Sequence, residues 1–253
     1  MKKIKIFYFT ITFFCLVSCA SKKDLIYLQN NKENQKASSY EPYLQKDDVL
    51  LILVTSENPE IAAPYNLKSV IIDNNTPDAT TNTKLQTYII DSNGNIEFPI
   101  LGSIHLAGLT KSDAVAKVKE ALKDHVTDAV VNIRILNFKI SVLGEVTHPG
   151  SYTIKSERIT LLEALSLAGD LTIYGKRNNI LLIREQNGNK VMERIDITKT
   201  DFMDSPYYYL SQNDVLYVEP NKTRINSSSI GPNITVGISA LSLIVTIIAL
   251  TTR

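Results

Sequence analysis

The strongest constraint in this sequence is a charge-free stretch at its carboxyl end. Residues 225–252 contain no Asp, Glu, Lys or Arg, and residues 234–250 are almost wholly apolar. A helix rises about 1.5 Å per residue, so a helix over 234–252 would reach roughly 28 Å, close to the ~30 Å hydrocarbon core of a bilayer. The composition therefore predicts one carboxyl-terminal transmembrane helix over residues 234–252, preceded by a linker over 221–233.

The few polar residues of this predicted helix share one face: Thr235, Ser239, Ser242 and Thr246. They are spaced four, three and four apart, which at about 100° per residue keeps them in a narrow stripe. Such a stripe can pack against copies of itself or line a water-filled channel between several helices. Both uses need several copies and favour a homo-oligomer. The alternative is a single tail anchor whose hydroxyl groups bond back to their own helix.

The amino-terminal end of the chain has the pattern of a secretory signal peptide. Three lysines precede an apolar run over residues 6–17, and residues 16–19 resemble a bacterial lipoprotein box. In such a box the leader, here residues 1–18, is cut before the cysteine, and Cys19 is then acylated. The alternative is an unmodified cysteine in an ordinary signal. Ala20, where an Asp would favour retention in the inner membrane, favours the outer membrane.

The composition of the mature chain excludes several classes of function. Cleavage removes Cys15 and lipid occupies Cys19, so no thiol remains for a disulfide or a metal. The formal charge falls from +1 to −2 when the three leader lysines leave, and no basic cluster remains to bind nucleic acid. His105, His125 and His148 lack the spacing of a metal site, and no nucleophile is paired with a base. We therefore expect no enzymatic activity, no cofactor and no metal.

Residues 19–39 are polar and read as a tether, and residues 40–138 read as a first α+β domain. A turn precedes an apolar strand that begins near residue 49, and Asn58 caps a short helix that starts at Pro59. The Asn- and Thr-rich stretch 73–84 is predicted as a loop. Asn93 and Gly94 predict a hairpin that joins strands 87–91 and 96–98. A helix over 111–124 and a strand over 129–136 complete this domain.

Residues 139–220 read as a second small α+β domain with a β-grasp-like fold. Strands over 140–146 and 151–154 flank a turn in which Gly150 is expected to take a positive φ. Thr160 and Glu163 predict a capping box for a helix over 161–168, which Gly169 would end in a left-handed conformation. A hairpin over 180–195 and a closing strand over 209–218 follow.

Two further patterns in the chain each have two interpretations. Residues 43–50 are echoed by residues 209–216, with Tyr, Leu, Asp, Val and Leu at matching positions. The echo marks either one turn used twice or a coincidence within a common β-turn pattern. The run Tyr207, Tyr208 and Tyr209 would either stack on sugar rings or pack in the core at the start of a strand.

The order and separation of these motifs resemble the outer-membrane polysaccharide export family, the Wza-like lipoproteins. The first domain is similar to their polysaccharide export domain, and the second to their soluble-ligand-binding β-grasp (SLBB) domain. The resemblance covers nearly everything from residue 44 to residue 220. The motif residues that carry it are Gly94, Phe98, Pro99, Gly102, Gly144, Glu145, Pro149, Gly150 and Gly169.

The resemblance implies a lipid-anchored outer-membrane protein with a periplasmic body that assembles into a homo-oligomeric ring. In that family the carboxyl-terminal helices form a barrel through the outer membrane, which would place Thr235, Ser239, Ser242 and Thr246 on the lumen face. The implied cargo is a capsular or extracellular polysaccharide, and the implied partner is an inner-membrane polysaccharide co-polymerase. The alternative is a periplasmic glycan-binding or scaffold lipoprotein that makes no pore.

Overall fold

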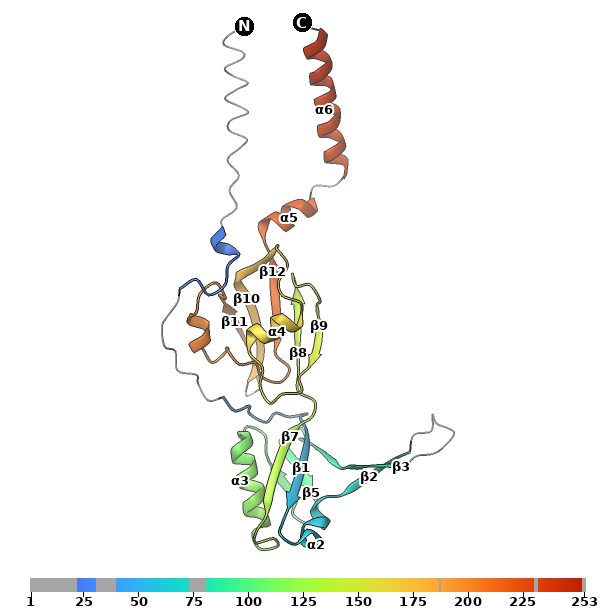
Figure 1. The fold of residues 1–253 in the computed structure, drawn as a ribbon, viewed down its shortest axis with the longest axis vertical. Helices are drawn as coiled ribbons and strands as arrows, with labels where there is room; N and C mark the ends of the chain where they lie inside the picture. Colours follow the sequence, from blue (N-terminus) through green and yellow to red (C-terminus); the bar gives the residue numbers. More distant parts are fainter. Residues whose placement is uncertain (1–21, 31–39, 73–80, 187, 230–231, 252–253) are drawn as a thin grey trace.

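The computed structural model describes residues 22–30, 40–72, 81–186, 188–229 and 232–251. Two mixed α/β domains follow one another along the chain, and each has its own buried apolar cluster. Two further helices extend from the end of the second domain that lies away from the first (Figure 1). The predicted leader and Cys19 lie outside the described residues.

The first domain is built around a three-stranded antiparallel sheet in the order β4-β1-β7. Every second residue of β1 is buried, and helix α3 lies against β7 with its apolar face inward. The elements of this domain are β1 (Val49–Thr55), α2 (Pro59–Ala62), η2 (Ala63–Tyr65), β2 (Lys68–Ile72), β3 (Thr81–Leu85), β4 (Thr87–Ile89), β5 (Asn95–Phe98), β6 (Gly102–His105), α3 (Lys111–Leu122) and β7 (Val130–Ile135).

Two strand pairings of the first domain differ from those predicted. The turn at Asn93 and Gly94 is present, and the amide of Asp91 donates to the carbonyl of Asn95 at 2.8 Å. However, β5 pairs with β6, whereas β4 pairs with β1. The loop predicted over 73–84 is also wrong in part, because Thr81–Leu85 forms β3 and pairs with β2 in an arm that projects from the domain (Figure 1). Residues 73–80 lie outside the described residues.

The second domain is a five-stranded mixed sheet in the order β11-β10-β12-β8-β9, with α4 packed on one face. Strands β12 and β8 run parallel, and the other neighbouring pairs are antiparallel. The elements of this domain are β8 (Lys139–Gly144), β9 (Gly150–Thr153), α4 (Leu161–Leu167), β10 (Gly175–Gln186), β11 (Asn189–Ile195), η3 (Asp201–Asp204) and β12 (Val215–Pro220). One helix on a mixed sheet agrees with the predicted β-grasp-like arrangement.

The local signals in the second domain hold with two exceptions. Thr160 and Glu163 form the capping box of α4, and Gly169 takes a φ of +73° after the helix. Gly150, in contrast, begins β9 without the positive φ that we expected. The closing strand is also shorter than predicted, because β12 begins at Val215 and the preceding residues form a turn.

The segments outside the two domains carry more structure than the sequence suggested. Part of the predicted tether lies against the second domain, where the amide of Leu28 donates to the carbonyl of Ile197 at 3.2 Å. The short helix η1 (Lys22–Asp24) begins this segment. Helix α5 (Lys222–Ser229) occupies the predicted linker, and α6 (Pro232–Thr251) follows it.

Among the residues described, no helix is long and apolar enough to cross a membrane. The transmembrane assignment of residues 234–252 therefore has no support from the helices in the structure.

The sequence echo marks a structural module that is used once in each domain. At its start Tyr43 bridges Thr110 and Tyr209 bridges Thr160, and each of these threonines caps the helix of its domain. An aspartate then closes a turn and the central strand of the sheet follows, β1 in the first domain and β12 in the second. The echo is therefore a repeated turn and not a coincidence of pattern.

Candidate functional site

The repeated turn has nearly the same hydrogen bonds in both domains. The Oδ2 atom of Asp48 accepts the amide of Gln45 at 2.8 Å, and the Oδ2 atom of Asp214 accepts the amide of Ser211 at 2.8 Å. The residue before each aspartate has a positive φ, +66° at Asp47 and +64° at Asn213, in a region that Asp and Asn tolerate. Both closing aspartates are fully buried.

The connection between the domains is held from both sides at these turns. Asn137, between β7 and β8, accepts the amide of Val49 at 2.9 Å and donates to the carbonyl of Asp47 at 2.9 Å. From the other turn, Gln212 accepts the amide of Lys139 at 2.8 Å and donates to the carbonyl of Asn137 at 3.0 Å. Each side chain therefore saturates two backbone groups, and the junction is tied to both central strands.

An arginine that the sequence analysis did not single out organises the second turn. The Nε and Nη2 atoms of Arg184 donate to Asp214 at 3.0 and 2.6 Å, and Nη2 also donates to the carbonyl of Tyr209 at 2.9 Å. Burial raises the pKa of Asp214 and the guanidinium of Arg184 opposes the rise. Strand β10 buries Ile180, Leu182 and Arg184 in alternation, and this period is the signal that could have identified the arginine from sequence.

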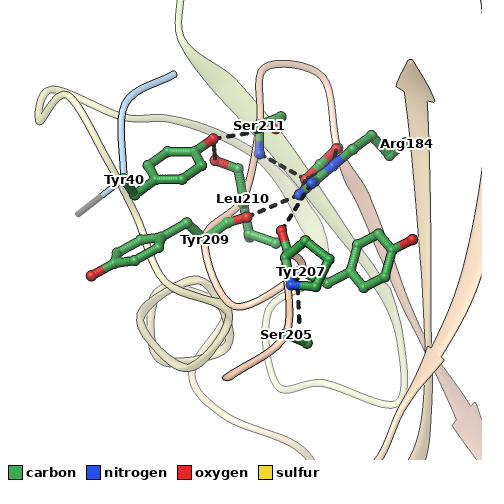
Figure 2. Close-up of polar contacts among 9 residues, drawn as sticks. Tyr40, Arg184, Ser205, Tyr207, Tyr209, Leu210 and Ser211 are labelled. Carbon is green, nitrogen blue, oxygen red and sulfur yellow. Dashed lines mark hydrogen bonds and ion pairs between the residues drawn. The ribbon is translucent and has the colours of Figure 1, made fainter. Parts of the chain in front are cut away.

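Tyr207 and Tyr209 lie beside Arg184 (Figure 2), and Tyr208 packs against Tyr209. Tyr40 stacks on Tyr209 with ring centroids 4.7 Å apart, and the guanidinium carbon of Arg158 lies 5.5 Å from the same ring. Tyr208 meets Tyr209 edge to face at 4.9 Å, and Arg184 lies over Tyr207. The aromatic groups are therefore engaged with one another and with arginines, as expected for structural packing.

The motif residues of the first domain shape the turns that flank β5 and β6. Gly94 takes a φ of +89°, and a Cβ there would lie 2.5 Å from the ring of His105. Phe98 is buried and packs against Tyr88 with centroids 5.1 Å apart. Pro99 and Gly102, the latter at a φ of +72°, bound the tip between the two strands. These positions are structural, because they fix backbone paths and one core ring.

The motif residues of the second domain close the end of the sheet from which α5 departs. Gly144 takes a φ of +90°, and a Cβ there would lie 2.1 Å from the carbonyl oxygen of Val218, so only glycine fits. Glu145 accepts the hydroxyl of Thr172 at 2.8 Å and the Nε atom of Arg224 at 3.2 Å. The remaining motif residues, which form the turns near His148, are Pro149, Gly150 and Gly169.

Family comparisons agree with this two-domain arrangement. A family described as "Polysaccharide biosynthesis/export protein" matches residues 36–136, and a family described as "SLBB domain" matches residues 138–218. The chain therefore contains a domain of the polysaccharide biosynthesis/export family, followed by an SLBB domain. The first domain is thus the export domain and the second is the SLBB domain.

Two similar proteins are both named "EPS I polysaccharide export outer membrane protein EpsA". The one from Ralstonia solanacearum is 25% identical over 197 residues, which cover 77% of this chain and 52% of the relative. The one from Ralstonia nicotianae is 29% identical over 147 residues, which cover 56% of this chain and 39% of the relative. The chain thus spans about half or less of the length of these relatives.

The export and SLBB domains also share a polar cavity of about 460 Å³. Lys111 pairs with Glu157 across it, and the hydroxyl of Ser112 donates to Glu41 at 2.7 Å. Its lining residues are Tyr40, Glu41, Pro42, Lys111, Ser112, Ser156, Glu157 and Arg158. The lining carries two acidic and two basic side chains, so it offers no net charge by which to select a ligand.

The residues considered for catalysis or metal binding are not gathered in one place among the described residues. His105 contacts the side chain of Asn95 at 3.0 Å, and His125 lies beside the ring of Tyr65. Within the described ranges, no group of three or more His, Cys, Asp or Glu side chains is arranged to hold a metal ion.

The polar stripe of α6 is only partly described. The hydroxyl of Ser242 donates to the carbonyl of Ser239 at 2.8 Å, and that of Thr246 donates to the carbonyl of Ser242 at 2.8 Å. This is the internal bonding expected of hydroxyl residues on a single helix. The side chain of Thr235 lies outside the described residues, so the pore-lining role of the stripe stays a prediction.

Proposed function

We propose that this protein is an outer-membrane subunit of an oligomeric exporter of capsular or extracellular polysaccharide. The observation that carries the proposal is the succession of an export domain and an SLBB domain in one chain. The names of the two relatives support the outer-membrane location and the polysaccharide cargo in this proposal. Because the chain spans only part of those relatives, their role is extended to it here as a proposal.

The physical task of such a protein is to replace hydrocarbon with a hydrated path. A polysaccharide carries many hydroxyl groups, and each one buried without a partner costs on the order of several kcal/mol. No bond has to be made or broken. The protein must instead supply polar groups whose contacts with the chain are weak enough to release it, a demand that Ser and Thr meet better than fixed charges.

Helix α6 supports an oligomeric assembly because its apolar side chains are exposed in the single chain. Exposed apolar surface of this extent is typical of a contact with protein or lipid. We propose that α6 helices of several copies gather at the outer membrane, with Thr235, Ser239, Ser242 and Thr246 toward a water-filled interior. The exposed apolar residues of α6 are Val236, Ile238, Leu241, Leu243, Ile244, Val245, Ile247 and Leu250.

The remaining parts of the proposal are the anchor and the partner. Acylation of Cys19 would hold the amino terminus in the outer membrane, because each buried CH₂ contributes about 0.8 kcal/mol. The periplasmic body would receive the polysaccharide from an inner-membrane polysaccharide co-polymerase. The alternative, a glycan-binding or scaffold lipoprotein without a pore, gains no support from the tyrosines, since Tyr40 and Arg158 already contact the ring of Tyr209.

The test places the double variant Ser239→Leu with Ser242→Leu in a strain that lacks the wild-type gene. We expect the detergent-extracted particle to keep its oligomeric size while surface polysaccharide falls, because leucines close a polar interior. Ala240→Leu is the control, since it adds a leucine off the stripe, and it should leave surface polysaccharide near normal. Normal polysaccharide in the double variant would refute the pore-lining stripe, and a monomeric wild-type particle would refute the oligomeric exporter.

A further inference from the structure

The segments that leave the SLBB domain meet at one end of it. The amide of Asn221, before α5, donates to the carbonyl of Tyr174 at 2.7 Å, and the guanidinium of Arg224 lies over the ring of Tyr174. The amino-terminal segment reaches the same end, where η1 contacts β10 (Figure 1). The loop before β10 therefore lies between residues 22–30 and the helix that leads to α6.

One tyrosine links the amino-terminal segment to the loop before β10. The hydroxyl of Tyr27 donates to Asp170 at 2.6 Å, and the guanidinium carbon of Arg177 lies 5.6 Å from the centre of its ring. Arg177 in turn donates to the carbonyls of Thr172 and Gly175 at 3.1 and 2.7 Å. Tyr27, the loop and β10 thus form one packed unit.

Exposed apolar side chains from three separate segments surround this unit. Ile173 is the most exposed of them, at 58%, although it lies in a loop held by hydrogen bonds on both sides. We call this set the apical rim, and its members are Leu25, Ile26, Ile173, Tyr174 and Ile225. Side chains that remain exposed on a fixed backbone form a preformed apolar surface.

The charges around the apical rim are mainly basic. The acid beside α5 is already neutralised, because Glu145 accepts from Arg224. Asp24 is the acidic residue of the two segments 22–30 and 221–229. The basic residues of these segments are Lys22, Lys23, Lys222 and Arg224.

We infer that the apical rim rests on the headgroup layer of an anionic phospholipid membrane. Large aliphatic side chains with Tyr and Lys are the combination that partitions to this layer, and the basic residues complement lipid phosphates. The inference rests on the proposed function, because it takes the membrane from the proposed acylation of Cys19, three residues before η1. It adds that the SLBB domain itself contacts lipid and is held at a fixed height and tilt.

The sequence contains no tryptophan, so the fluorescence of a single introduced tryptophan reports only on the position where it is placed. Ile173→Trp places one indole on the apical rim of the complete mature chain, and Ile225→Trp places a second reporter on α5. Ile100→Trp is the matched control, since Ile100 is 63% exposed at the tip between β5 and β6 of the other domain. Each variant is reconstituted into vesicles of phosphatidylethanolamine and phosphatidylglycerol, with or without a spin-labelled phosphatidylcholine.

We expect Trp emission from the Ile173→Trp and Ile225→Trp chains to shift to shorter wavelength and to be quenched by the spin-labelled lipid. The emission wavelength of the Ile100→Trp chain should stay at the value that it has without vesicles. Replacing Lys23 and Lys222 by Glu in the Ile173→Trp chain should weaken the quenching.

A chain that floats with the vesicles but shows no quenching at either reporter overturns the rim contact alone. A blue shift without quenching also overturns it, since another copy of the chain then covers the rim. A chain that does not float overturns the proposed membrane location as well.

Discussion

Asp48 and Asp214 occupy the same position in the repeated turn, but the two domains treat the buried carboxyl differently. In the SLBB domain the Arg184 guanidinium donates to both oxygens of Asp214. In the export domain the Oδ2 atom of Asp48 accepts one backbone amide, and among the described residues its buried Oδ1 atom has no hydrogen-bond partner. One turn is therefore completed by an ion pair and the other is left with an unsatisfied oxygen.

The electrostatic consequence follows from burial. Desolvation raises the pKa of Asp48 to about 6, and the neighbouring Asp47 carboxylate adds to the rise. The same desolvation acts on Asp214, but there a fixed guanidinium supplies the opposite charge. The comparison teaches that the turn needs the Oδ2 atom for its shape, whereas the treatment of the charge is set by what each sheet places beside it.

The largest effect on stability is expected when Arg184 is replaced. Arg184→Met should lower the unfolding free energy of the SLBB domain by about 3–5 kcal/mol, because it leaves Asp214 as a buried unpaired charge. The urea midpoint of each domain, followed by NMR of its buried isoleucine methyl groups, separates the two domains. Ile140 and Ile180 report the SLBB domain, and Ile52 and Ile133 report the export domain.

Arg194→Met is the matched control, because Arg194 also pairs with an acid, Glu219, at 2.8 Å, but its side chain is 55% exposed. Its removal should cost only about 0–1 kcal/mol. Equal costs for Arg184 and Arg194 would contradict the importance of burial. Adding Asp214→Leu to Arg184→Met should recover part of the loss, since it removes the stranded charge.

The second test follows the stability of the export domain as a function of pH. With a pKa of about 6 in the folded chain and 3.8 as the ordinary value, Asp48 binds more protons folded than unfolded between these pH values. Its contribution to stability is therefore complete below about pH 4 and is lost as the pH rises to about 6. The loss amounts to at most about 3 kcal/mol.

Asp48→Asn should remove this contribution to the pH dependence of the export domain. Asparagine stays neutral throughout, so the variant should match the wild type near pH 4 and exceed it above pH 6. The urea midpoint read at Ile52 and Ile133 measures the difference across this range. Parallel pH profiles for wild type and variant would contradict an unpaired, protonatable Asp48.

The sequence predicts the parts of the fold that depend on near neighbours. Thr110 and Thr160 identified both capped helices, since a cap is formed within four residues of the chain. One of the two interpretations of the echo, a turn used twice, is also confirmed, because in both domains the turn aspartate bonds an amide three residues before it. These signals are local in sequence, so no knowledge of the fold is needed to interpret them.

The features that were missed depend on partners distant in sequence or on weak patterns. The Asn93 and Gly94 pair predicts a turn but cannot say that β5 will pair with β6. Strand β3 lacks the apolar alternation by which strands are recognised. Arg184 and Asp214 are thirty residues apart, so their pairing follows from the register of β10 and β12.

Smaller effects than the loss of Arg184 should come from the two amides at the junction, each of which serves one turn. Asn137→Ala leaves the amide of Val49 and the carbonyl of Asp47 without their partner and should cost the export domain about 1–2 kcal/mol. Gln212→Ala does the same to the amide of Lys139 and the carbonyl of Asn137, at a similar cost to the SLBB domain. The isoleucine methyl midpoints assign each loss to its domain.

The double variant Asn137→Ala with Gln212→Ala tests whether the two turns act as one junction. Gln212 bonds the backbone of Asn137 and not its side chain, so each single variant leaves the other set of bonds in place. The losses should therefore add to within about 0.5 kcal/mol. A larger coupling energy between the two substitutions would mean that the segment between β7 and β8 shifts as a unit when either side chain is lost. The two turns would then be one structural element shared by both domains.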